Sequence, residues 1–467
     1  SDILAPYACK DGDGTFQLYR KFKPLVDKSE QFSSLYANIL KPATYALMKL
    51  EKNGGPINKA QVAWLSEQYQ IDVEECLDEI AHHEAVKRFE RIHGKSFNPN
   101  STMQCRELFG NILGIKLTKK TATGAASVDK EVLKEMGHPL SEAILDLREK
   151  SKMAGTYINN ILRGVDYDGR LRSGFNIHGT TSGRLSSSGS LNYQNIPRDN
   201  KDIKKLFKAR DGYKIVQCDL GTAEVYYAAV LSNDMFLQQA FIDKLDFHSY
   251  VAKQMFNLTC EVADVKDLYP AYRQYAKAIT FGIMYQAGPA KIAETVNKDA
   301  KAGEEISISQ AKQFINKYFS EAKLLKRFID GSNRQIENHA YIYAFFGRKR
   351  RLPEALSPNP GAAKHAVRSG VNFLVQSVAS DINILGLIDL VTWVEESGYD
   401  DVIKPFTVVH DSIVSEVRED LIPEYIANAK RCIQLDRGLS IENCPIKVDF
   451  EIGPSWGELQ DEDKYFC

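Results

Sequence analysis

Two short segments with strand-like patterns lie far apart in this chain, and each carries an aspartate where its regular pattern stops. Residues 215–218 are mostly apolar and are followed by Asp219. Residues 406–417 alternate apolar and polar side chains around His410 and Asp411, which predicts a hairpin with that pair at its tip. Most residues between the two segments have helical periodicity, so the fold is predicted to be α+β with helices in the majority.

The composition is that of a folded protein with no strong overall charge. The chain has 467 residues, of which 43% are hydrophobic and 26% charged, and its formal net charge is −1. At about 100–200 residues per domain, this length predicts roughly two to four domains or subdomains. Any binding of nucleic acid must therefore depend on locally concentrated positive charge.

Sequence signals for secretion, for a membrane span and for a disulfide or zinc framework are missing. No apolar run approaches the roughly 20 residues of a membrane span, and the N-terminal residues do not resemble a signal peptide. The 8 cysteines are scattered without any CxxC pair, which favours reduced thiols. We expect a cytoplasmic monomer with no membrane partner.

Asp219 and Asp411 are the strongest candidates for metal ligands. Carboxylates that reach one site from separate strands can hold two Mg²⁺ ions, because Mg²⁺ prefers oxygen ligands and is usually bound by one or two carboxylates plus substrate phosphates. Two such ions would activate an attacking hydroxyl and stabilise a leaving pyrophosphate, and Mn²⁺ could replace them. The competing interpretation is that each aspartate only caps a turn.

A helical stripe of four side chains predicts a nucleotide site. Arg273, Lys277, Phe281 and Tyr285 recur every four residues and so share one broad face of a helix. The two cations suit a triphosphate, and the two rings suit a sugar and a base. The alternative is a pair of surface cations above two core aromatic rings.

A second stripe interrupts a later helix that is otherwise apolar, and it consists of Arg368, Asn372 and Gln376. Polar groups on a helix fit for burial need partners. Base edges in the minor groove of a duplex would supply them, and the acceptors there are much the same for every base pair. A buried internal polar network is the alternative.

Three basic clusters supply local positive charge. They are Lys119-Lys120, the group Lys201, Lys204, Lys205, Lys208 and Arg210, and the run Arg348-Lys349-Arg350-Arg351, which we expect in a loop. Basic runs are most often solvated faces. Each cluster alone is weak evidence for a nucleic-acid site. Three clusters on a nearly neutral chain together favour contacts to the phosphates of a nucleic-acid backbone.

Several motifs, taken in order, resemble those of the family A DNA polymerases, the bacterial DNA polymerase I type. The similarity runs from about residue 35 to the C-terminus. The motifs are Phe97 to Ser101, Lys119-Lys120-Thr121, Thr181 to Ser187, Asn192 to Pro197, Asp219 to Glu224, Arg273 to Tyr285 and Val409-His410-Asp411.

The resemblance implies catalytic residues that include the metal ligands, residues that bind the incoming dNTP, and residues that contact the primer–template DNA. The ligands of the two Mg²⁺ ions would be Asp219 and Asp411. The triphosphate would be bound by the catalytic cations Arg273 and Lys277 with His248, and the rest of the nucleotide site would be Phe281, Tyr285 and Glu224, with Glu224 excluding a 2′-hydroxyl. The duplex would be contacted by Arg184, Arg368, Asn372, Gln376 and His410.

The resemblance also implies a right-hand fold, in which a palm with an antiparallel sheet lies between a thumb and helical fingers. The thumb would be residues 35–165, the palm 166–235 and 366–467, and the fingers 236–365. Residues 1–34, with a turn near Asp11 to Gly14, would be a remnant of a 3′–5′ exonuclease domain, because Tyr7-xxx-Asp11 resembles its last motif. The rest of that domain and other replication proteins are expected partners, and this chain is expected not to proofread.

Three departures from the family pattern indicate a divergent branch, in keeping with a phage protein in a bacterial cell. Ser412 stands where the family usually has Glu, Gln286 replaces the usual Gly, and residues 220–224 read Leu-Gly-Thr-Ala-Glu. The usual Glu is a secondary carboxylate at the metal site, so Ser412→Glu is expected to preserve or improve activity with Mg²⁺. Asp449-Phe450-Glu451 has the letters of an exonuclease motif, which we regard as a coincidence.

Two other functions compete with that of a DNA polymerase. A single-subunit RNA polymerase can carry a His-Asp-Ser motif, but it must admit a 2′-hydroxyl, and Glu224 argues against that. A non-catalytic nucleic-acid-binding module would not need Asp219, Asp411, Arg273 and Lys277. The predicted reaction is attack of a primer 3′-hydroxyl on the α-phosphate of a dNTP, in replication or repair, with positioning and charge stabilisation supplied by the protein.

Overall fold

The centre of the protein is a five-stranded antiparallel sheet in the order β11-β10-β5-β9-β8. The computed structural model describes residues 4–121, 124–197, 200–298, 300–301 and 303–467. The two strand signals of the sequence lie side by side in this sheet, as expected. Its strands are β5 (Tyr213–Leu220), β8 (Ile403–Val409), β9 (Ser412–Arg418), β10 (Val448–Gly453) and β11 (Gln460–Asp461).

Alternation along β5 gives the sheet one buried face and one more open face. Val216, Cys218 and Leu220 belong to a core cluster that also contains residues of three helices, whereas Gln217 and Asp219 are only partly buried. Those helices are α11 (Ala223–Ser232), α19 (Pro360–Glu396) and α20 (Ile422–Gln434). Thr222 precedes α11 with a φ of 51° and makes no capping bond through its side chain, although a threonine directly before a helix is a common N-cap.

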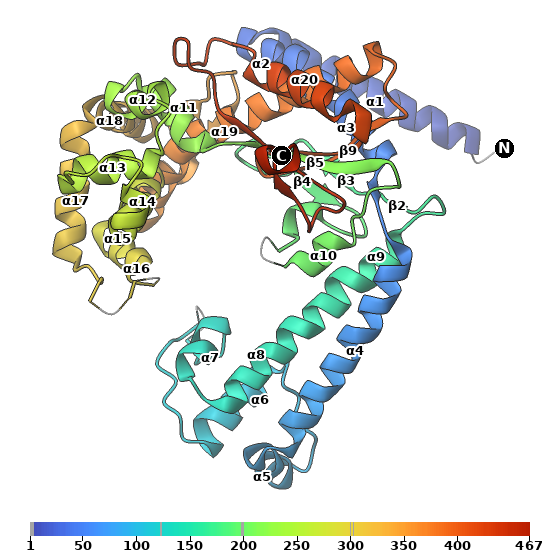
Figure 1. Ribbon diagram of the computed structural model, residues 1–467, viewed down its shortest axis with the longest axis vertical. Coiled ribbons are helices and arrows are strands. Elements are labelled where there is room, and N and C mark those ends of the chain that lie inside the picture. Colours follow the sequence, from blue (N-terminus) through green and yellow to red (C-terminus); the bar gives the residue numbers. More distant parts are fainter. Residues whose placement is uncertain (1–3, 122–123, 198–199, 299, 302) are drawn as a thin grey trace.

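A large helical unit follows β5 and returns to the sheet through α19 (Figure 1). This confirms that most residues between the two strand segments are helical. The expected basic loop is instead a hairpin, because Tyr341 and Arg351 pair in antiparallel register. The unit contains α12 (Met235–Ile242), α13 (Phe247–Phe256), α14 (Val265–Leu268), α15 (Pro270–Met284), α16 (Pro289–Lys298), α17 (Ile308–Glu321), α18 (Lys323–His339), β6 (Tyr341–Tyr343), β7 (Lys349–Arg351) and a 3₁₀ turn (Pro353–Leu356).

A second helical unit extends away from the sheet as a long antiparallel pair, at the bottom of Figure 1. Its far end has a core of its own that includes Phe89, Phe109 and Leu133. The unit contains α4 (Lys59–His82), α5 (Glu84–His93), α6 (Thr102–Arg106), α7 (Lys130–Met136), α8 (Pro139–Lys152), α9 (Asn159–Gly164) and π-helical turns at Glu107–Ile112 and Met153–Ile158.

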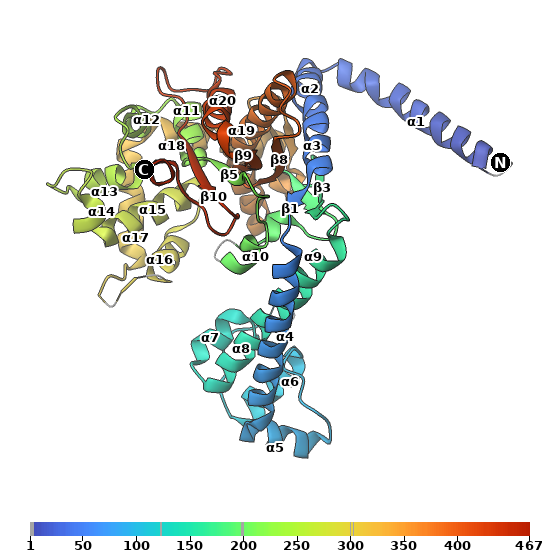
Figure 2. The ribbon, with the colours of Figure 1, turned by 45° about the vertical axis from the view of Figure 1, so that its right-hand side comes forward.

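The N-terminal helices differ from the prediction. α1 (Leu4–Asp27) has no buried residue and continues through the expected turn, because Thr15 and Gln17 donate hydrogen bonds one helical turn back, to Asp11 and Asp13. Figure 2 shows α1 projecting away from the other helices. The chain continues as α2 (Glu30–Leu35), a π-helical turn (Tyr36–Leu40) and α3 (Lys41–Asn53). α3, which lies within the range expected for the thumb, packs on β8 and α19, and the long helical pair begins with α4.

Short elements join the long helical pair to the sheet. β1 (Gly55–Pro56) pairs with β2 (Arg170–Leu171), and β3 (Gly174–Asn176) pairs with β4 (Ser186–Ser188). A Cβ atom on Gly55 would lie 2.9 Å from the Phe207 ring, so only glycine fits there. The remaining elements are α10 (Lys201–Lys205), α21 (Glu462–Tyr465) and 3₁₀ turns at Tyr193–Asn195 and Glu419–Leu421.

Within the described part of the chain, one helix, α19, is long and apolar enough to cross a membrane. In the protein, 78% of its most apolar window is buried. Its apolar side chains therefore serve as those of a core helix.

Candidate active site

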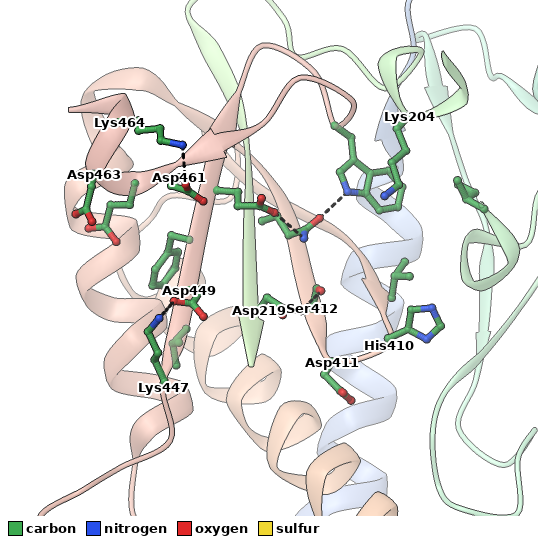
Figure 3. A pocket seen from close by; sticks show the side chains of 18 residues that line it. Lys204, Asp219, His410, Asp411, Ser412, Lys447, Asp449, Asp461, Asp463 and Lys464 are labelled. Atoms are coloured by element: carbon green, nitrogen blue, oxygen red, sulfur yellow. Dashed lines mark hydrogen bonds and ion pairs between the residues drawn. The ribbon is translucent and has the colours of Figure 1, made fainter. Parts of the chain in front are cut away.

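Asp219 lies on the open face of the sheet between residues of two neighbouring strands. The strand register pairs it with Ser412 of β9 and with Asp449 of β10. Residues paired across an antiparallel sheet point to the same face, with Cβ atoms about 4.5–5.5 Å apart. Figure 3 shows the three side chains on the wall of one pocket, with Asp411 beside them in the turn after β8.

This pocket has a volume of about 940 Å³ and a strongly acidic lining. Asp449 is bridged to Lys447, whose Nζ lies 2.7 Å from Oδ1 of Asp449. Burial, together with the nearby carboxylates of Asp461 and Asp219, raises the pKa of Glu451. The acidic side chains of the lining are Asp219, Asp411, Asp449, Glu451, Asp461, Glu462 and Asp463, and the basic ones are Lys204, Lys447 and Lys464.

The two predicted metal ligands fit a divalent ion that substrate phosphates help to coordinate. The amide of Leu220 donates to the carbonyl of Asp411 at 3.3 Å, which ties the end of β5 to the hairpin turn. Over the described ranges, no three acidic, histidine or cysteine side chains are arranged to hold a metal ion by themselves. One or two carboxylates completed by phosphate oxygens are the usual protein site for Mg²⁺.

The hairpin tip is fixed by a glutamine to which the sequence motifs gave no role. His410 is exposed and has a φ of 55°, in the left-handed region. Its amide donates to Oε1 of Gln194 at 3.2 Å, and Nε2 of Gln194 donates to the carbonyl of Val408 at 2.5 Å. The segment around Gln194 therefore sets the position of the turn that carries His410 and Asp411.

In the helical unit, Arg273 of α15 is held by a carboxylate at the start of α13. Its Nε and Nη2 donate to the two oxygens of Asp246 at 2.8 and 2.9 Å. Asp246 also caps α13 by accepting from the amide of Ser249 at 2.8 Å. Although burial acts in the opposite direction, these hydrogen bonds hold the pKa of Asp246 well below its usual range.

His248 lies beneath the same stripe and is only 5% exposed. Its ring centroid is 5.7 Å from that of Phe281. Burial lowers the pKa of His248 to about 4, and the charges of Arg273 and Lys277 act in the same direction. His248 is therefore a neutral imidazole near pH 7, with one nitrogen that donates and one that accepts.

Glu224 of α11 links Arg184 to the residue that ends α15, Tyr285. Nη2 of Arg184 donates to Oε1 of Glu224 at 2.7 Å, and the hydroxyl of Tyr285 donates to Oε2 at 3.1 Å. Nε2 of Gln376 reaches the same hydroxyl at 3.5 Å. Burial and the Glu224 carboxylate raise the pKa of Tyr285. Four of the predicted site residues therefore form one chain of polar contacts.

The other polar residues on α19 do not share that chain of contacts. Arg368 is exposed and Asn372 is half-buried. Within the stripe, hydrogen bonding to other parts of the protein therefore involves the Gln376 end, where the Tyr285 side chain is still 42% exposed.

Each of the three basic clusters has at least one member with a partner within the protein, and in the cluster of residues 201–210 Arg210 pairs with Glu416 at 3.2 Å. Nη2 of Arg348 lies 2.6 Å from the fully buried carboxylate of Asp381, and Lys349 lies 3.8 Å from the Tyr341 ring centroid. Lys119 is paired with Asp129 at 3.1 Å and with Glu131 at 2.6 Å.

α15 ends in a turn built from a glycine and a strained glutamine. A Cβ atom on Gly282 would lie 2.6 Å from the Ile292 side chain, so glycine lets α15 and α16 approach closely. Gln286 has a φ of 49° although it is not glycine. Its side-chain amide exchanges two hydrogen bonds with Asn333 of α18, at 3.1 and 3.4 Å.

Sequence reasoning missed Asp449, Asp246 and Gln194 as members of the site. Asp449 had a usable signal, because Lys447, Asp449 and Glu451 alternate with apolar residues along the strand. Asp246 and Gln194 gave no such signal, since their roles depend on contacts with distant segments.

The family model described as DNA polymerase family A matches residues 67–458. The chain is 44% identical over 466 residues to the DNA polymerase of Escherichia phage T5, covering 96% of this chain and 54% of that protein. It is 28% identical over 460 residues to DNA polymerase I of Pseudomonas aeruginosa, covering 97% of this chain and 47% of that protein. The chain thus spans about half the length of the curated relatives it matches.

A solved structure agrees with these sequence matches. The POL domain of Pol1 from M. smegmatis, in complex with DNA primer-template and dNTP, superposes with a TM-score of 0.77 at 25% identity, covering 94% of this chain and 73% of that one. This likeness confirms the predicted right-hand fold. Since the family match spans most of its length, the chain belongs to DNA polymerase family A.

Proposed function

We propose that this chain is a template-directed DNA polymerase that extends the 3′-hydroxyl of a primer with dNTPs. The observation that supports this most is that Asp219 and Asp411 meet at one end of the sheet, beside an acidic pocket. The helix with the nucleotide stripe is tied to the same end of the sheet by the bond from Tyr285 to Glu224. The proposed metal ligands and the proposed nucleotide site would thus lie side by side.

Asp219 and Asp411 would hold two Mg²⁺ ions, and Mn²⁺ could replace them. The ions, when bound, would lower the pKa of the primer hydroxyl and stabilise the negative charge that develops on the leaving pyrophosphate. The protein supplies the acidic pocket that attracts the ions, the strand pairing that fixes Asp219 and the hairpin turn that carries Asp411. Such preorganisation lowers the reorganisation needed during the reaction.

The incoming dNTP would lie along α15. Arg273 and Lys277 would bind its triphosphate, and neutral His248 would donate a hydrogen bond to a phosphate oxygen. Phe281 and Tyr285 would pack against the sugar and bases. Glu224, fixed by Arg184 and Tyr285, would fill the space of a 2′-hydroxyl.

The primer–template duplex would lie across the palm, between thumb and fingers. Its minor groove would be contacted by Arg184, Arg368, Asn372, Gln376 and His410. We assign the thumb to the long helical pair that begins with α4, the fingers to α12 through β7, and the palm to the sheet with α11, α19 and α20. We further propose that the residues described here do not proofread.

Primer extension with Mg²⁺ tests the proposal. Asp219→Ala and Asp411→Ala should each reduce the rate by about 10³-fold or more, because metal-assisted charge stabilisation supplies several kcal/mol. Asp401→Ala is the matched control, since Asp401 is fully exposed and pairs with Lys404 at 3.9 Å, away from the pocket. Binding of primer–template DNA should remain in all three variants. A near-normal rate for either of the first two variants would refute the two-metal assignment.

Comparing rNTPs with dNTPs separates this function from that of an RNA polymerase. The wild-type protein should prefer dNTPs, and Glu224→Ala should raise the use of rNTPs because a smaller side chain leaves room for the 2′-hydroxyl. An unchanged preference in Glu224→Ala would remove Glu224 from sugar selection.

A further inference from the structure

Ser412 stands where the polymerase family usually has a glutamate, and we had interpreted it as the loss of a carboxylate. In the structure its hydroxyl contacts Asp219. It is the first residue of β9, directly opposite Asp219, and is only 8% exposed. Its Oγ donates a hydrogen bond to Oδ1 of Asp219 at 2.5 Å. Figure 3 shows the Ser412 and Asp219 side chains next to each other, with Asp411 and Asp449 nearby.

This hydrogen bond has two physical effects on Asp219. A donor to an ionised carboxylate forms a strong, charge-assisted bond that stabilises the ionised form. The bond also restricts rotation of the carboxylate and engages only Oδ1. The other oxygen, Oδ2, is then presented in a defined direction.

The other side of Asp219 explains why a donor at position 412 is useful. Asp449 lies opposite Asp219 on the neighbouring strand, and like charges directly opposite each other across strands are destabilising. Lys447 offsets part of the Asp449 charge through a contact of 2.7 Å, but both residues of that pair are well exposed. A glutamate at position 412 would place a third carboxylate in this row and remove the hydroxyl donor that Ser412 supplies to Asp219.

We propose that Ser412 is a positioning residue that orients the Asp219 carboxylate for a divalent ion. The proposal rests on the proposed function, because it assigns Asp219 to metal binding. It reverses the expectation that Ser412→Glu preserves or improves activity. In this protein the serine hydroxyl, acting through Asp219, supplies what the site needs at position 412.

Ser412→Ala is the decisive variant, and the strand offers a matched control. Ser415 lies on β9 too, is fully buried and shares a 2.7 Å hydrogen bond with the hydroxyl of Tyr425, away from the pocket. Ser415→Ala removes one buried hydroxyl from the same strand without touching Asp219. Ser412→Thr keeps a hydroxyl at the position and should behave like the wild-type protein.

Two measurements separate positioning from general stability. The first is the Mg²⁺ concentration that gives half-maximal primer extension. The second is the affinity of the protein–primer–template complex for Mn²⁺ in the absence of turnover. It is measured from the decrease of the free Mn²⁺ signal in electron paramagnetic resonance. Removing a group that orients a metal ligand typically costs about 10–100-fold in metal affinity or activity.

Ser412→Ala and Ser412→Glu should therefore weaken Mn²⁺ binding and raise the Mg²⁺ requirement by about 10–100-fold. Ser412→Thr and Ser415→Ala should change neither quantity, and binding of primer–template DNA should be equal in all variants. The proposal is wrong if Ser412→Ala matches Ser415→Ala in Mn²⁺ binding, or if Ser412→Thr is as impaired as Ser412→Ala. A folded, active Asp219→Ala would instead refute the proposed function, so the two failures are distinguishable.

Discussion

In the sheet, Asp219 and Asp411 take their positions from strand pairing and a hairpin turn, whereas Arg273 and Tyr285 on α15 are held by other side chains. Arg273 is bound by both oxygens of Asp246, and Tyr285 is bound by Glu224. A ligand can enter the sheet side without breaking backbone pairs. On the helical side, a ligand that takes Arg273 or Tyr285 must compete with a partner that is already there.

This difference concerns preorganisation. Groups fixed by the backbone lose little freedom when a ligand binds, and so more of the contact energy contributes to affinity or catalysis. Groups that exchange partners bind more weakly but can respond to which ligand is present. The predictions below test whether the sheet side is rigid and the helical side exchangeable.

The largest expected effect is on the sheet side, from Glu416→Ala. Glu416 of β9 is fully buried and lies 2.8 Å from Arg170 and 3.2 Å from Arg210. Removing one partner of a buried ion pair should reduce the free energy of unfolding by about 3–5 kcal/mol, as measured by urea denaturation. Glu419→Ala is the control, because the exposed pair of Glu419 with Lys214 should cost only about 0–1 kcal/mol. Equal losses in the two variants would contradict the rigid sheet.

The next effect concerns the pH dependence of stability on the helical side. An unfolded histidine has a pKa of about 6.5, and that of His248 is lowered to about 4 in the folded protein. As the pH falls, the unfolded chain binds the proton first. The contribution of neutral, buried His248 to the free energy of unfolding is therefore complete above about pH 6.5 and is lost toward pH 4.

The change His248→Gln removes this titration. Between pH 7.5 and 5.5, the wild-type protein should lose about 1.4 kcal/mol more unfolding free energy than the variant, which urea melts at the two pH values can measure. Parallel losses in the two proteins would show that His248 titrates near its ordinary value when folded.

A smaller effect is expected from Asp246→Asn, which releases Arg273 while keeping a side chain that can cap α13. The pair is partly exposed, so its net contribution is at most about 1 kcal/mol, or about fivefold in affinity. The KM for dNTPs in primer extension should fall by up to that factor. A higher KM would mean that Asp246 positions Arg273 for the substrate instead of competing for it.

The smallest effect should come from Gln286→Gly at the end of α15. Glycine relieves the left-handed conformation but loses the two hydrogen bonds to Asn333, so the net change in stability should stay within about 1 kcal/mol. Asn333→Ala loses the same bonds without that relief and should be the less stable of the two in thermal melts. The reverse order would show that the amide pair contributes little.

Alternation and helical spacing were sufficient to predict the strand pair at the centre of the site and the stripe on α15. They could not predict that Asp449 lies opposite Asp219, because the register of β10 on β5 depends on packing between distant segments. They also could not predict that Ser412 donates to Asp219, since only the register of β9 places the two together. The resemblance led us to regard Ser412 as a lost carboxylate, and our proposal, argued from the hydrogen bond, gives Ser412 a positioning role instead.

α19 runs without interruption for 37 residues, from the hairpin β6–β7 to the far side of α20. A helix of this length is about 55 Å long, so a tilt of about 5° at one end would move the other end by about 5 Å. Gln376, which contacts Tyr285, and Ser380, which donates to the carbonyl of Gly183 at 3.1 Å, lie on this one rod. Because Gln376 and Ser380 lie only about one helical turn apart, the contact to the helical unit and the contact to the segment that carries Arg184 are made by the same turn of α19.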